Sequence, residues 1–497
     1  MAAGINGHKV NPASFPFFLM LIKTDREIIQ SYFEDYSNLK GGYADRIFIP
    51  EQAEEVAAVL REANASKTPV TVSGAGTGQA GGRIPFGGLS LSTERLSRIK
   101  KIEKDKNGGV AVVEAGVVIK DLKKACEKKG LYYTYDPTEQ TAFVGGTIAT
   151  NASGARSFKY GSTRRCVRAL KIVLADGKPF EIKRGDVRAK GRLMEFEAGR
   201  RLYKIILPCY RMPATKNSAG FYARENMDLV DLFIGQEGAL GVIVEATLGL
   251  PERPRSFFSC FAFFPDEGSA CDFVDGARGA APSLIEYFDG NTLNLLREKY
   301  SNVPVKAAAS VFFEDEIGDD EDAIMEKWET LLSKHGVSLD DTWVAMNEKA
   351  RQDFSDRRHY IPEMMDEMSK KFHFPKIHTD LAVPPAKFRE MLAFYNENLA
   401  KSALRYFVFG HIGDAHLHVN MIPKGKKGQD EAMALRGEFV KKSVSLGGTV
   451  SAEHGIGKTK KEFLRILYGQ KGIDEMIAVK RVLDPNLILG RGNVFDC

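Results

Sequence analysis

The spacing of apolar residues between positions 46 and 93 predicts a strand, a helix and two further strands. Residues 46–49 form a short apolar run, and Pro50 opens a stretch whose apolar side chains recur at helical spacing, namely Val56, Val59, Leu60 and Ala63. The chain returns to a β-branched run at 70–73, and residues 89–93 (Leu-Ser-Leu-Ser-Thr) alternate as a strand does. The pattern predicts a β-α-β unit that leads into the loop between 73 and 89.

That loop begins with residues 73–82, which are almost all Gly, Ala or Thr. Such a backbone can curl and present successive N–H groups to an anion, which favours a phosphate-binding loop. Gly76, Gly78 and Gly81 have the spacing of a Rossmann turn, but that turn must open a helix, whereas Pro85 and a strand follow here. We therefore exclude the Rossmann turn. A flexible hairpin without a ligand remains the alternative.

A second strand–helix unit leads to another region of small residues. Residues 110–118, 120–129 and 131–135 have the patterns of a strand, a helix and a strand. Residues 145–154 are rich in Gly, Ala, Ser and Thr, so their backbone could approach a ligand closely. Two such regions suit an extended dinucleotide, although a helix packed closely through Gly and Ala would leave the same pattern. Strands are expected again at 169–174 and 179–182, joined by an Asp-Gly turn.

Prolines at 251 and 254 mark the end of this first region. From 257 to about 423 the pattern mixes strands (257–264, 307–313, 406–410) with helices (323–334, 385–397). We therefore predict an α+β chain with three parts. These cover residues 1–250, 251–425 and 426–497. The resemblance of the motifs to a known family, and not the pattern, implies their roles: a cofactor domain, a substrate (cap) domain, and a C-terminal helical segment that completes the active site and packs on the first domain.

Four of the nine histidines lie between residues 411 and 454. After an apolar strand, His411 opens a turn, and the alternation of residues 415–422 places three polar side chains on one strand face: His416, His418 and Asn420. A hairpin would bring His411 back toward His418, and Glu453 precedes His454 in a glycine-bounded turn. Two His and one Glu suit a divalent metal with a position open for substrate. Polar residues on a solvated strand are the alternative.

Composition excludes several classes of protein. The 497 residues suffice for two or three domains. The 70 basic and 65 acidic residues leave a net charge of +5, which by itself argues neither for nor against a nucleic-acid partner, and none is expected. The six cysteines include no C-x-x-C pair, which argues against an iron–sulfur cluster or zinc ribbon and indicates a reducing compartment. The longest apolar run near the N-terminus has eight residues, so we expect neither a transmembrane span nor a signal peptide.

Several motifs together resemble one flavoprotein fold. The loop at 73–82, the pair at 136–137, residues 145–154, Lys159-Tyr-Gly161 and residues 237–241 are similar to the FAD domain of the vanillyl-alcohol oxidase / p-cresol methylhydroxylase (PCMH-type) fold. Over about residues 40–497 the motif order is most similar to the glycolate oxidase, D-lactate dehydrogenase and D-2-hydroxyglutarate dehydrogenase group. The cofactor-binding positions that this resemblance implies are Ser73, Gly74, Ala75, Gly76, Thr77, Gly78, Gln79, Asp136, Pro137, Gly145, Gly146, Thr150, Asn151, Ser153, Gly154, Tyr160, Glu237, Gly241, Val242 and Asn493.

The same resemblance implies the chemistry. It implies noncovalent FAD, because no His stands in the first loop, where some relatives attach flavin. Its pattern H-x-G-D-G-N-x-H followed by E-H-G-I-G implies a divalent metal, Zn or Mn by ligand type, and His454 as catalytic base. Arg358 and Lys376 fall where the family places cations that bind the substrate carboxylate. The implied metal ligands are His411, His418 and Glu453.

The implied function is an FAD-dependent dehydrogenase that oxidises a D-2-hydroxy acid of the D-lactate, glycolate or D-2-hydroxyglutarate type to the 2-oxo acid. Metal-assisted proton abstraction would accompany hydride transfer to flavin N5. Electrons would pass to a quinone, a cytochrome, an electron-transfer flavoprotein or an iron–sulfur subunit. A cytoplasmic location is expected, with peripheral membrane contact left open. An oxidase of another alcohol and an electron-transfer subunit without its own substrate are the alternatives.

Three departures from the family pattern affect this interpretation. Ala75 replaces a Gly, and Ala415-His416 replaces Gly-Asn inside the metal motif, so His416 could add a ligand or meet the flavin. Residues 488–492 (Ile-Leu-Gly-Arg-Gly) stand where the family usually has Leu-Asn-Pro-Gly, which removes an Asn. A shifted substrate or acceptor could follow from these changes.

Overall fold

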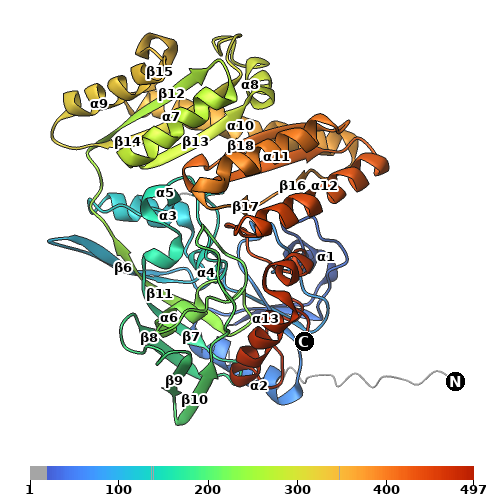
Figure 1. Cartoon of the computed structure of the whole chain (residues 1–497). Coiled ribbons are helices and arrows are strands. Elements are labelled where there is room, and N and C mark those ends of the chain that lie inside the picture. Colours follow the sequence, from blue (N-terminus) through green and yellow to red (C-terminus); the bar gives the residue numbers. More distant parts are fainter. Residues whose placement is uncertain (1–19, 136, 138, 346) are drawn as a thin grey trace.

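The computed structural model describes residues 20–135, 137, 139–345 and 347–497, and it has two halves, one above the other in Figure 1. The first half begins with β1 (Leu21–Lys23), α1 (Arg26–Ile29), η2 (Gln30–Phe33), β2 (Arg46–Ile49), α2 (Ala53–Ser66), β3 (Val70–Ser73), β4 (Leu89–Ser92), β5 (Ile99–Asp105), β6 (Gly108–Glu114) and α3 (Ile119–Glu127). It continues with α4 (Val144–Ala149), α5 (Ser157–Tyr160), η3 (Thr163–Arg165), β7 (Val167–Val173), β8 (Pro179–Lys183), β9 (Leu193–Ala198), β10 (Arg201–Ile206), α6 (Leu229–Phe233) and β11 (Val242–Leu250).

Three sheets support this half. A four-stranded sheet has the order β1-β2-β4-β3, a five-stranded antiparallel sheet has the order β5-β6-β11-β7-β8, and β9 pairs with β10. Strands β2 and β3 both run parallel to β4. Helix α2 packs on the first sheet through the four apolar residues that predicted it, all of which are buried. The predicted β-α-β unit is confirmed, and the glycine-rich loop leaves the C-terminal end of β3.

The structure differs from the prediction at two places in and after the second strand–helix unit. Residues 131–135 form no strand beyond a single bridge from Leu131 to Glu252, so that strand prediction is wrong. Strand β6 is already paired on both edges, by β5 and β11, and the aromatic side chains of Tyr133 and Tyr135 are buried in the core instead. Residues 144–149 form helix α4, which is the alternative that the small-residue pattern left open.

The second half is built on one large sheet. Its elements are β12 (Ser256–Phe264), α7 (Glu267–Ala280), β13 (Leu284–Asp289), α8 (Gly290–Arg297), β14 (Ala309–Ile317), α9 (Glu321–Lys334), η4 (Leu339–Asp341), β15 (Thr342–Ala345), α10 (Glu348–Phe372), β16 (Ile377–His378), β17 (Leu381–Ala382), η5 (Pro385–Lys387), α11 (Phe388–Ala400), β18 (Arg405–Gly410), η6 (Ile412–Asp414), β19 (His416–Ile422) and α12 (Lys426–Ser445). The strand order is β15-β12-β14-β13-β18-β19-β16, and β17 pairs with β19.

Both faces of this sheet are covered by helices. Alternate residues of β12 enter two different cores: Phe258 and Phe264 belong to the core that includes α7, whereas Phe261 and Phe263 pack with residues of α8 and α10. A strand buried on both faces reads as a continuous apolar run, which explains the sequence of β12. The predicted mixture of strands and helices in this region is confirmed.

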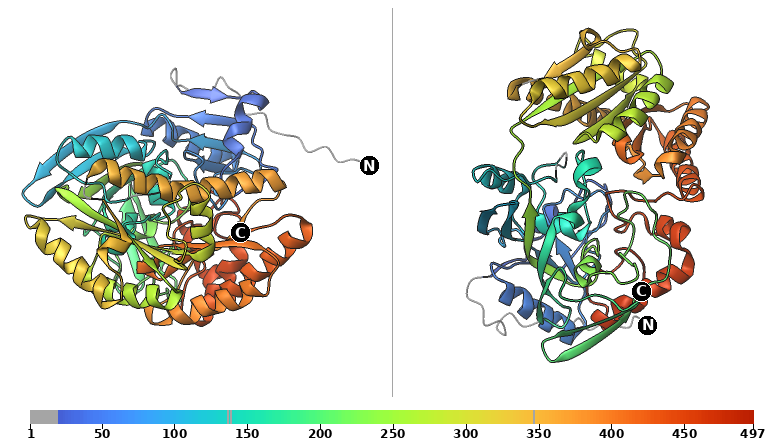
Figure 2. Two further views of the ribbon diagram at one scale, coloured as in Figure 1. Left: turned by 90° about the horizontal axis from the view of Figure 1, so that it is seen from above. Right: turned by 60° about the vertical axis from the view of Figure 1, so that its left-hand side comes forward.

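The chain joins the halves at two places. The connection from β11 to β12 runs along one side, and the segment after α12 returns to the first half, where α13 (Lys461–Leu483) contacts β10 (Figures 1 and 2). Residues 446–460 therefore cross from one half to the other. Among the described residues, we find no helix with the length and apolar character needed to cross a bilayer.

Candidate active site

The β18–β19 hairpin places three histidines together. Phe409 pairs with His418 across the hairpin, and His411 lies in the connection, with its ring centroid 5.8 Å from that of His418. His416 lies two residues before His418 on the same strand face, and their ring centroids are 4.4 Å apart. The predicted approach of His411 to His418 is therefore present.

Glu453 reaches this hairpin from the crossing segment. Its Oε1 is 3.2 Å from His418 Nε2, and its Oε2 is 3.5 Å from His411 Nε2. Ligand atoms that share one ion at bond lengths of about 2.1 Å lie roughly 3.0–3.4 Å apart. The spacing of these three side chains therefore fits a divalent metal. We call the group of His411, His416, His418, Glu453 and His454 the imidazole cluster.

The Nδ1 atom of each predicted histidine ligand already has a hydrogen-bond partner in the protein. His411 Nδ1 lies 2.9 Å from Glu286 Oε1, and His418 Nδ1 donates to the Thr379 carbonyl at 2.9 Å. Such partners fix the ring so that Nε2 faces the metal position, an arrangement typical of metal-binding histidines. Burial alone would raise the pKa of Glu286, but the Arg358 guanidinium and His411 lower it to about 2. Sequence reasoning missed Glu286, whose only signal is an acidic residue within an apolar strand.

Asp380 organises the turn that carries Glu453 and His454. Its carboxylate accepts hydrogen bonds from the backbone N–H groups of both residues, at 3.2 and 3.0 Å, and from Ser451 Oγ and Lys460 Nζ, at 2.6 and 2.8 Å. His454 Nδ1 lies 3.5 Å from Asp380 Oδ2. Burial lowers the pKa of His454 to about 4 despite this carboxylate, so the imidazole is neutral at pH 7.

The two predicted substrate cations have different surroundings. Arg358, on α10, donates from Nε and Nη2 to both oxygens of Glu286 at 2.7 and 2.8 Å. It therefore contacts the cluster through Glu286. Lys376 donates to Asp366 at 2.7 Å. His378, two residues further on, lies with its ring centroid 5.6 Å from that of His454, and sequence reasoning did not select it.

The imidazole cluster touches the first half of the molecule. Ser153, a predicted cofactor position, donates to Glu453 Oε2 at 3.3 Å, and Lys216 Nζ lies 2.7 Å from the same oxygen. The Lys216 side chain is only 6 % exposed. It comes from the long loop between β10 and α6, where sequence reasoning found no signal.

Comparison with known proteins agrees with this arrangement. Residues 44–183 match the family described as "FAD binding domain", and residues 253–494 match "FAD linked oxidases, C-terminal domain". The chain is 31% identical to a D-lactate dehydrogenase of Archaeoglobus fulgidus, over 90% of each chain. This is an FAD-linked oxidoreductase of that family.

Other relatives lie in the same group. The oxidoreductase is 29% identical to glycolate oxidase subunit GlcD of Bacillus subtilis, covering 91% of this chain and 89% of that protein. It is 28% identical to a D-2-hydroxyglutarate dehydrogenase of Stutzerimonas stutzeri, covering 95% and 96%. A solved alkyldihydroxyacetonephosphate synthase has a TM-score of 0.65 at 15% identity, covering 94% of this chain and 82% of that one, and it shares the fold. The resemblance to the PCMH-type fold is confirmed.

The first half of this oxidoreductase has open space beside two glycines, Gly74 in the loop after β3 and Gly146 in helix α4. A Cβ atom added to Gly74 would meet only Gly146 Cα, at 3.9 Å, and one added to Gly146 would meet no atom within 4 Å. We call this space the glycine notch. It is lined by backbone of the 73–79 loop and of α4, which fits a cofactor held by main-chain N–H groups.

At other predicted cofactor positions, the side chain makes hydrogen bonds to groups of the protein. Glu237 accepts from the backbone of Ile456 and Gly457 at 2.8 and 2.7 Å, and burial raises its pKa to about 7. Asn493 Nδ2 donates to the carbonyls of Gly82 and Glu237 at 2.9 Å. These two side chains tie the C-terminal segment to the first loop.

Three further positions also have protein partners, and two lie in the core. Thr150 Oγ1 donates to Gly146 O at 3.0 Å, and Asn151 Nδ2 donates to Asn217 O at 3.3 Å. Tyr160 donates to Glu316 in the other half. Gly241 and Val242 lie in the core at the start of β11, where a Cβ on Gly241 would lie 2.5 Å from Ile172. Asp136 lies outside the described residues.

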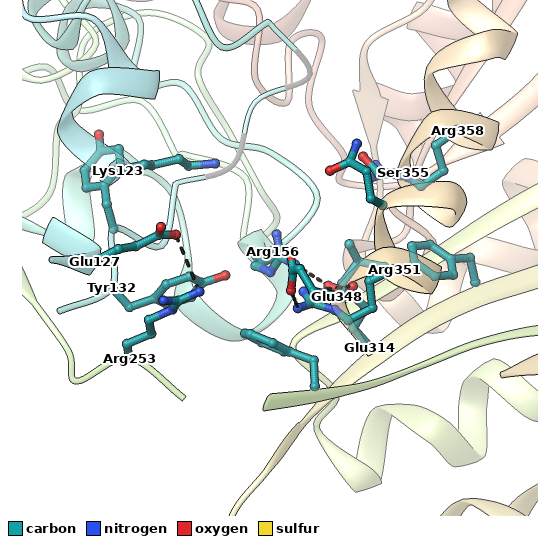
Figure 3. A pocket seen from close by; sticks show the side chains of 15 residues that line it. Lys123, Glu127, Tyr132, Arg156, Arg253, Glu314, Glu348, Arg351, Ser355 and Arg358 are labelled. Atoms are coloured by element: carbon teal, nitrogen blue, oxygen red, sulfur yellow. Dashed lines mark hydrogen bonds and ion pairs between the residues drawn. The ribbon is translucent and has the colours of Figure 1, made fainter. Parts of the chain in front are cut away.

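A cavity of about 260 Å³ lies between the halves, and Arg358 is on its wall (Figure 3). Figure 3 shows Lys123, Glu127 and Arg253 on one side and helix α10 on the other. Arg156 spans the gap and pairs with Glu314. Five basic residues line the cavity against three acidic ones: Lys123, Arg156, Arg253, Arg351 and Arg358 against Glu127, Glu314 and Glu348.

Proposed function

We propose that this oxidoreductase is a dehydrogenase that converts a D-2-hydroxy acid to the 2-oxo acid. The observation that carries the proposal is the contact between Ser153 and Glu453, residues 300 positions apart in sequence. It joins the segment after the glycine notch to a buried set of imidazoles and a carboxylate. An electron carrier without its own substrate needs no such set.

The two bound groups would divide the chemistry. When present, FAD supplies the hydride acceptor and a divalent metal supplies a Lewis acid. The FAD would be held noncovalently, by the glycine notch. His411, His418 and Glu453 would hold the metal, which is Zn or Mn by ligand type.

The protein's own groups would bind and deprotonate the substrate. His454 would accept the hydroxyl proton, since its ring lies beside Glu453, with Nε2 3.6 Å from Oε1, and Asp380 faces its other nitrogen. Arg358 and Lys376 would bind the carboxylate, and the basic excess in the cavity would attract the acid. Electrons would leave to a separate acceptor.

Anaerobic bleaching of the flavin tests this proposal. Purified holoprotein should lose its oxidised flavin absorbance with at least one of D-lactate, glycolate and D-2-hydroxyglutarate, and L-lactate should be slower. His454→Asn should bleach about 100-fold or more slowly, the usual size of a general-base effect. The matched control is His373→Asn, because His373 is an exposed helix C-cap at φ 58, a conformation that Asn accepts.

Three outcomes would contradict it. If no hydroxy acid bleaches the flavin, the protein carries electrons without a substrate of this class. If reduced flavin reoxidises in air as fast as with added acceptors, it is an oxidase. Equal bleaching by wild type and His454→Asn would remove His454 from the chemistry.

A further inference from the structure

His416 has an unexplained buried nitrogen. Its side chain is 0 % exposed, and neither Nδ1 nor Nε2 has a hydrogen-bond partner among the described residues. A buried polar group left without a partner costs about 1–3 kcal/mol. In the two other histidines of the hairpin, His411 and His418, Nδ1 has a hydrogen-bond partner and Nε2 faces Glu453.

We propose that His416 is a fourth protein ligand of the metal, beside His411, His418 and Glu453. This inference rests on the metal site of the proposed function. One ligand atom from each of these four side chains lies within 4.8 Å of all the others. The His416 ring centroid is 4.4 Å from that of His418 and 5.3 Å from that of His411. Asp380 Oδ1 is 3.3 Å from His416 Nε2, a proximity without hydrogen-bond geometry, so the ring still has an unpartnered nitrogen to offer the ion.

A second set of four groups with similar spacing does not fit as well. Asp380, His418, Glu453 and His454 also lie within 4.8 Å of one another. The Asp380 carboxylate, however, already accepts from two backbone N–H groups, Ser451 and Lys460. The Lys460 ammonium lies 2.8 Å from Asp380 Oδ2, and Oδ1 accepts from the backbone N–H of Glu453. Glu453 has its lysine, Lys216, on Oε2, whereas its Oε1 faces the imidazoles of His418 and His454. Asp380 therefore orients its neighbours rather than binding the ion.

Four protein ligands limit the choice of metal. Three imidazoles and one carboxylate would fill all four coordination positions of a tetrahedral ion, as protein ligands do in structural zinc sites. A hydroxy acid that binds through its hydroxyl and carboxylate oxygens needs two more positions. The set therefore suits a six-coordinate divalent ion such as Mn²⁺ better than four-coordinate Zn²⁺.

Counting bound imidazoles tests the inference. Holoprotein would be stripped with a chelator and reloaded with Cu²⁺ for pulsed EPR, or with Mn²⁺ for affinity measurement by chelator competition. Wild type should show three coordinated imidazoles and His416→Asn two. Mn²⁺ affinity should fall by more than about 10-fold, the lower end of effects measured for outer partners of metal ligands. The matched control is His378→Asn, a neighbouring histidine outside both metal sets, which should keep three imidazoles.

Several results would overturn it. Two imidazoles in the wild type would do so whatever the variants show, and so would a wild type that takes up neither ion. Weaker Mn²⁺ binding by His416→Asn with an unchanged imidazole count would make His416 an outer positioning residue. No hydroxy acid is present in these measurements, so three imidazoles in a protein that oxidises no hydroxy acid would refute the proposed function alone.

Discussion

The glycine notch and the imidazole cluster lie on either side of Ser153, yet they depend on different properties of the chain. The notch is formed by main chain at Gly74 and Gly146, where the absence of a Cβ leaves space. The cluster is formed by side chains that come from the β18–β19 connection, from β19 and from the segment that crosses between the halves. Two of its imidazoles have a partner elsewhere: Glu286 on β13 for His411 and the Thr379 carbonyl for His418.

This difference determines which changes each region tolerates. At the notch the identity of a neighbouring side chain matters little, but a single added carbon occupies the cofactor's space. In the cluster the volume matters less than charge and hydrogen bonding, because a buried polar group that loses its partner is costly. The predictions below test the two regions against each other.

Gly146→Val should give the largest effect, at the notch. The added side chain meets no protein atom within 4 Å at Cβ, so the thermal stability of the apoprotein should change by less than about 1 kcal/mol. FAD affinity should fall by roughly 100-fold or more, or about 2.7 kcal/mol. Flavin fluorescence titration and apoprotein melting measure the two quantities.

The neighbouring glycine is the control for that experiment. A Cβ on Gly145 would lie 2.6 Å from Ala115 Cβ, so Gly145→Ala should destabilise the apoprotein by about 1–3 kcal/mol through overpacking. If Gly146→Val destabilises the apoprotein as much as Gly145→Ala does, Gly146 lies in ordinary packing and the notch is not a cofactor site.

Glu286→Gln should weaken the cluster without touching the notch. The change removes the charge that joins Arg358 to His411, so metal affinity should fall by about 10–100-fold while the flavin content stays constant. Metal analysis after dialysis and flavin absorbance provide the measurements. Glu298→Gln, which removes an exposed pair with Arg405 at 3.4 Å, should change neither. Parallel loss of flavin and metal would show that the two regions are not independent.

Asp289→Asn should leave flavin and metal binding unchanged and should alter only the stability of the fold, in a way that depends on pH. Burial raises the pKa of Asp289 to about 6, whereas Glu286 on the same strand has cationic partners. A carboxyl whose pKa is higher in the folded state stabilises the fold below pH 4, and this contribution is lost as pH rises through 6. The variant should therefore gain up to about 3 kcal/mol over wild type between pH 4 and 7. Melting curves across that range measure the difference, and a constant difference would contradict the assignment.

The two regions also differ in how far the sequence predicted them. The glycine loop after β3, the β18–β19 hairpin and the approach of His411 to His418 follow from local periodicity, and the structure has all three. Glu286, Asp380 and Lys216 could not be found in the same way. Each is one charged residue without a motif, and its role depends on which distant strand or loop lies beside it.

Local patterns also failed where neighbouring strands decided the outcome. Residues 131–135 have a strand-like sequence but make only one bridge, from Leu131 to Glu252, and they bury Tyr133 and Tyr135 in the core. Lys376 and His378 both lie near the end of β16, and alternation alone could not show that His378 would lie beside His454 while Lys376 pairs with Asp366.

By itself the sequence determined the secondary structure around the glycine loop and the α+β character of the chain, since these follow from residue spacing over short distances. The family followed from the resemblance of its motifs, which the family models match over residues 44–183 and 253–494. Only the tertiary structure decided which groups orient His411 and His418, and that the buried His416 lies beside them and Glu453. Contacts across 40 to 300 residues depend on how sheets and connecting segments pack, and no local periodicity encodes that packing.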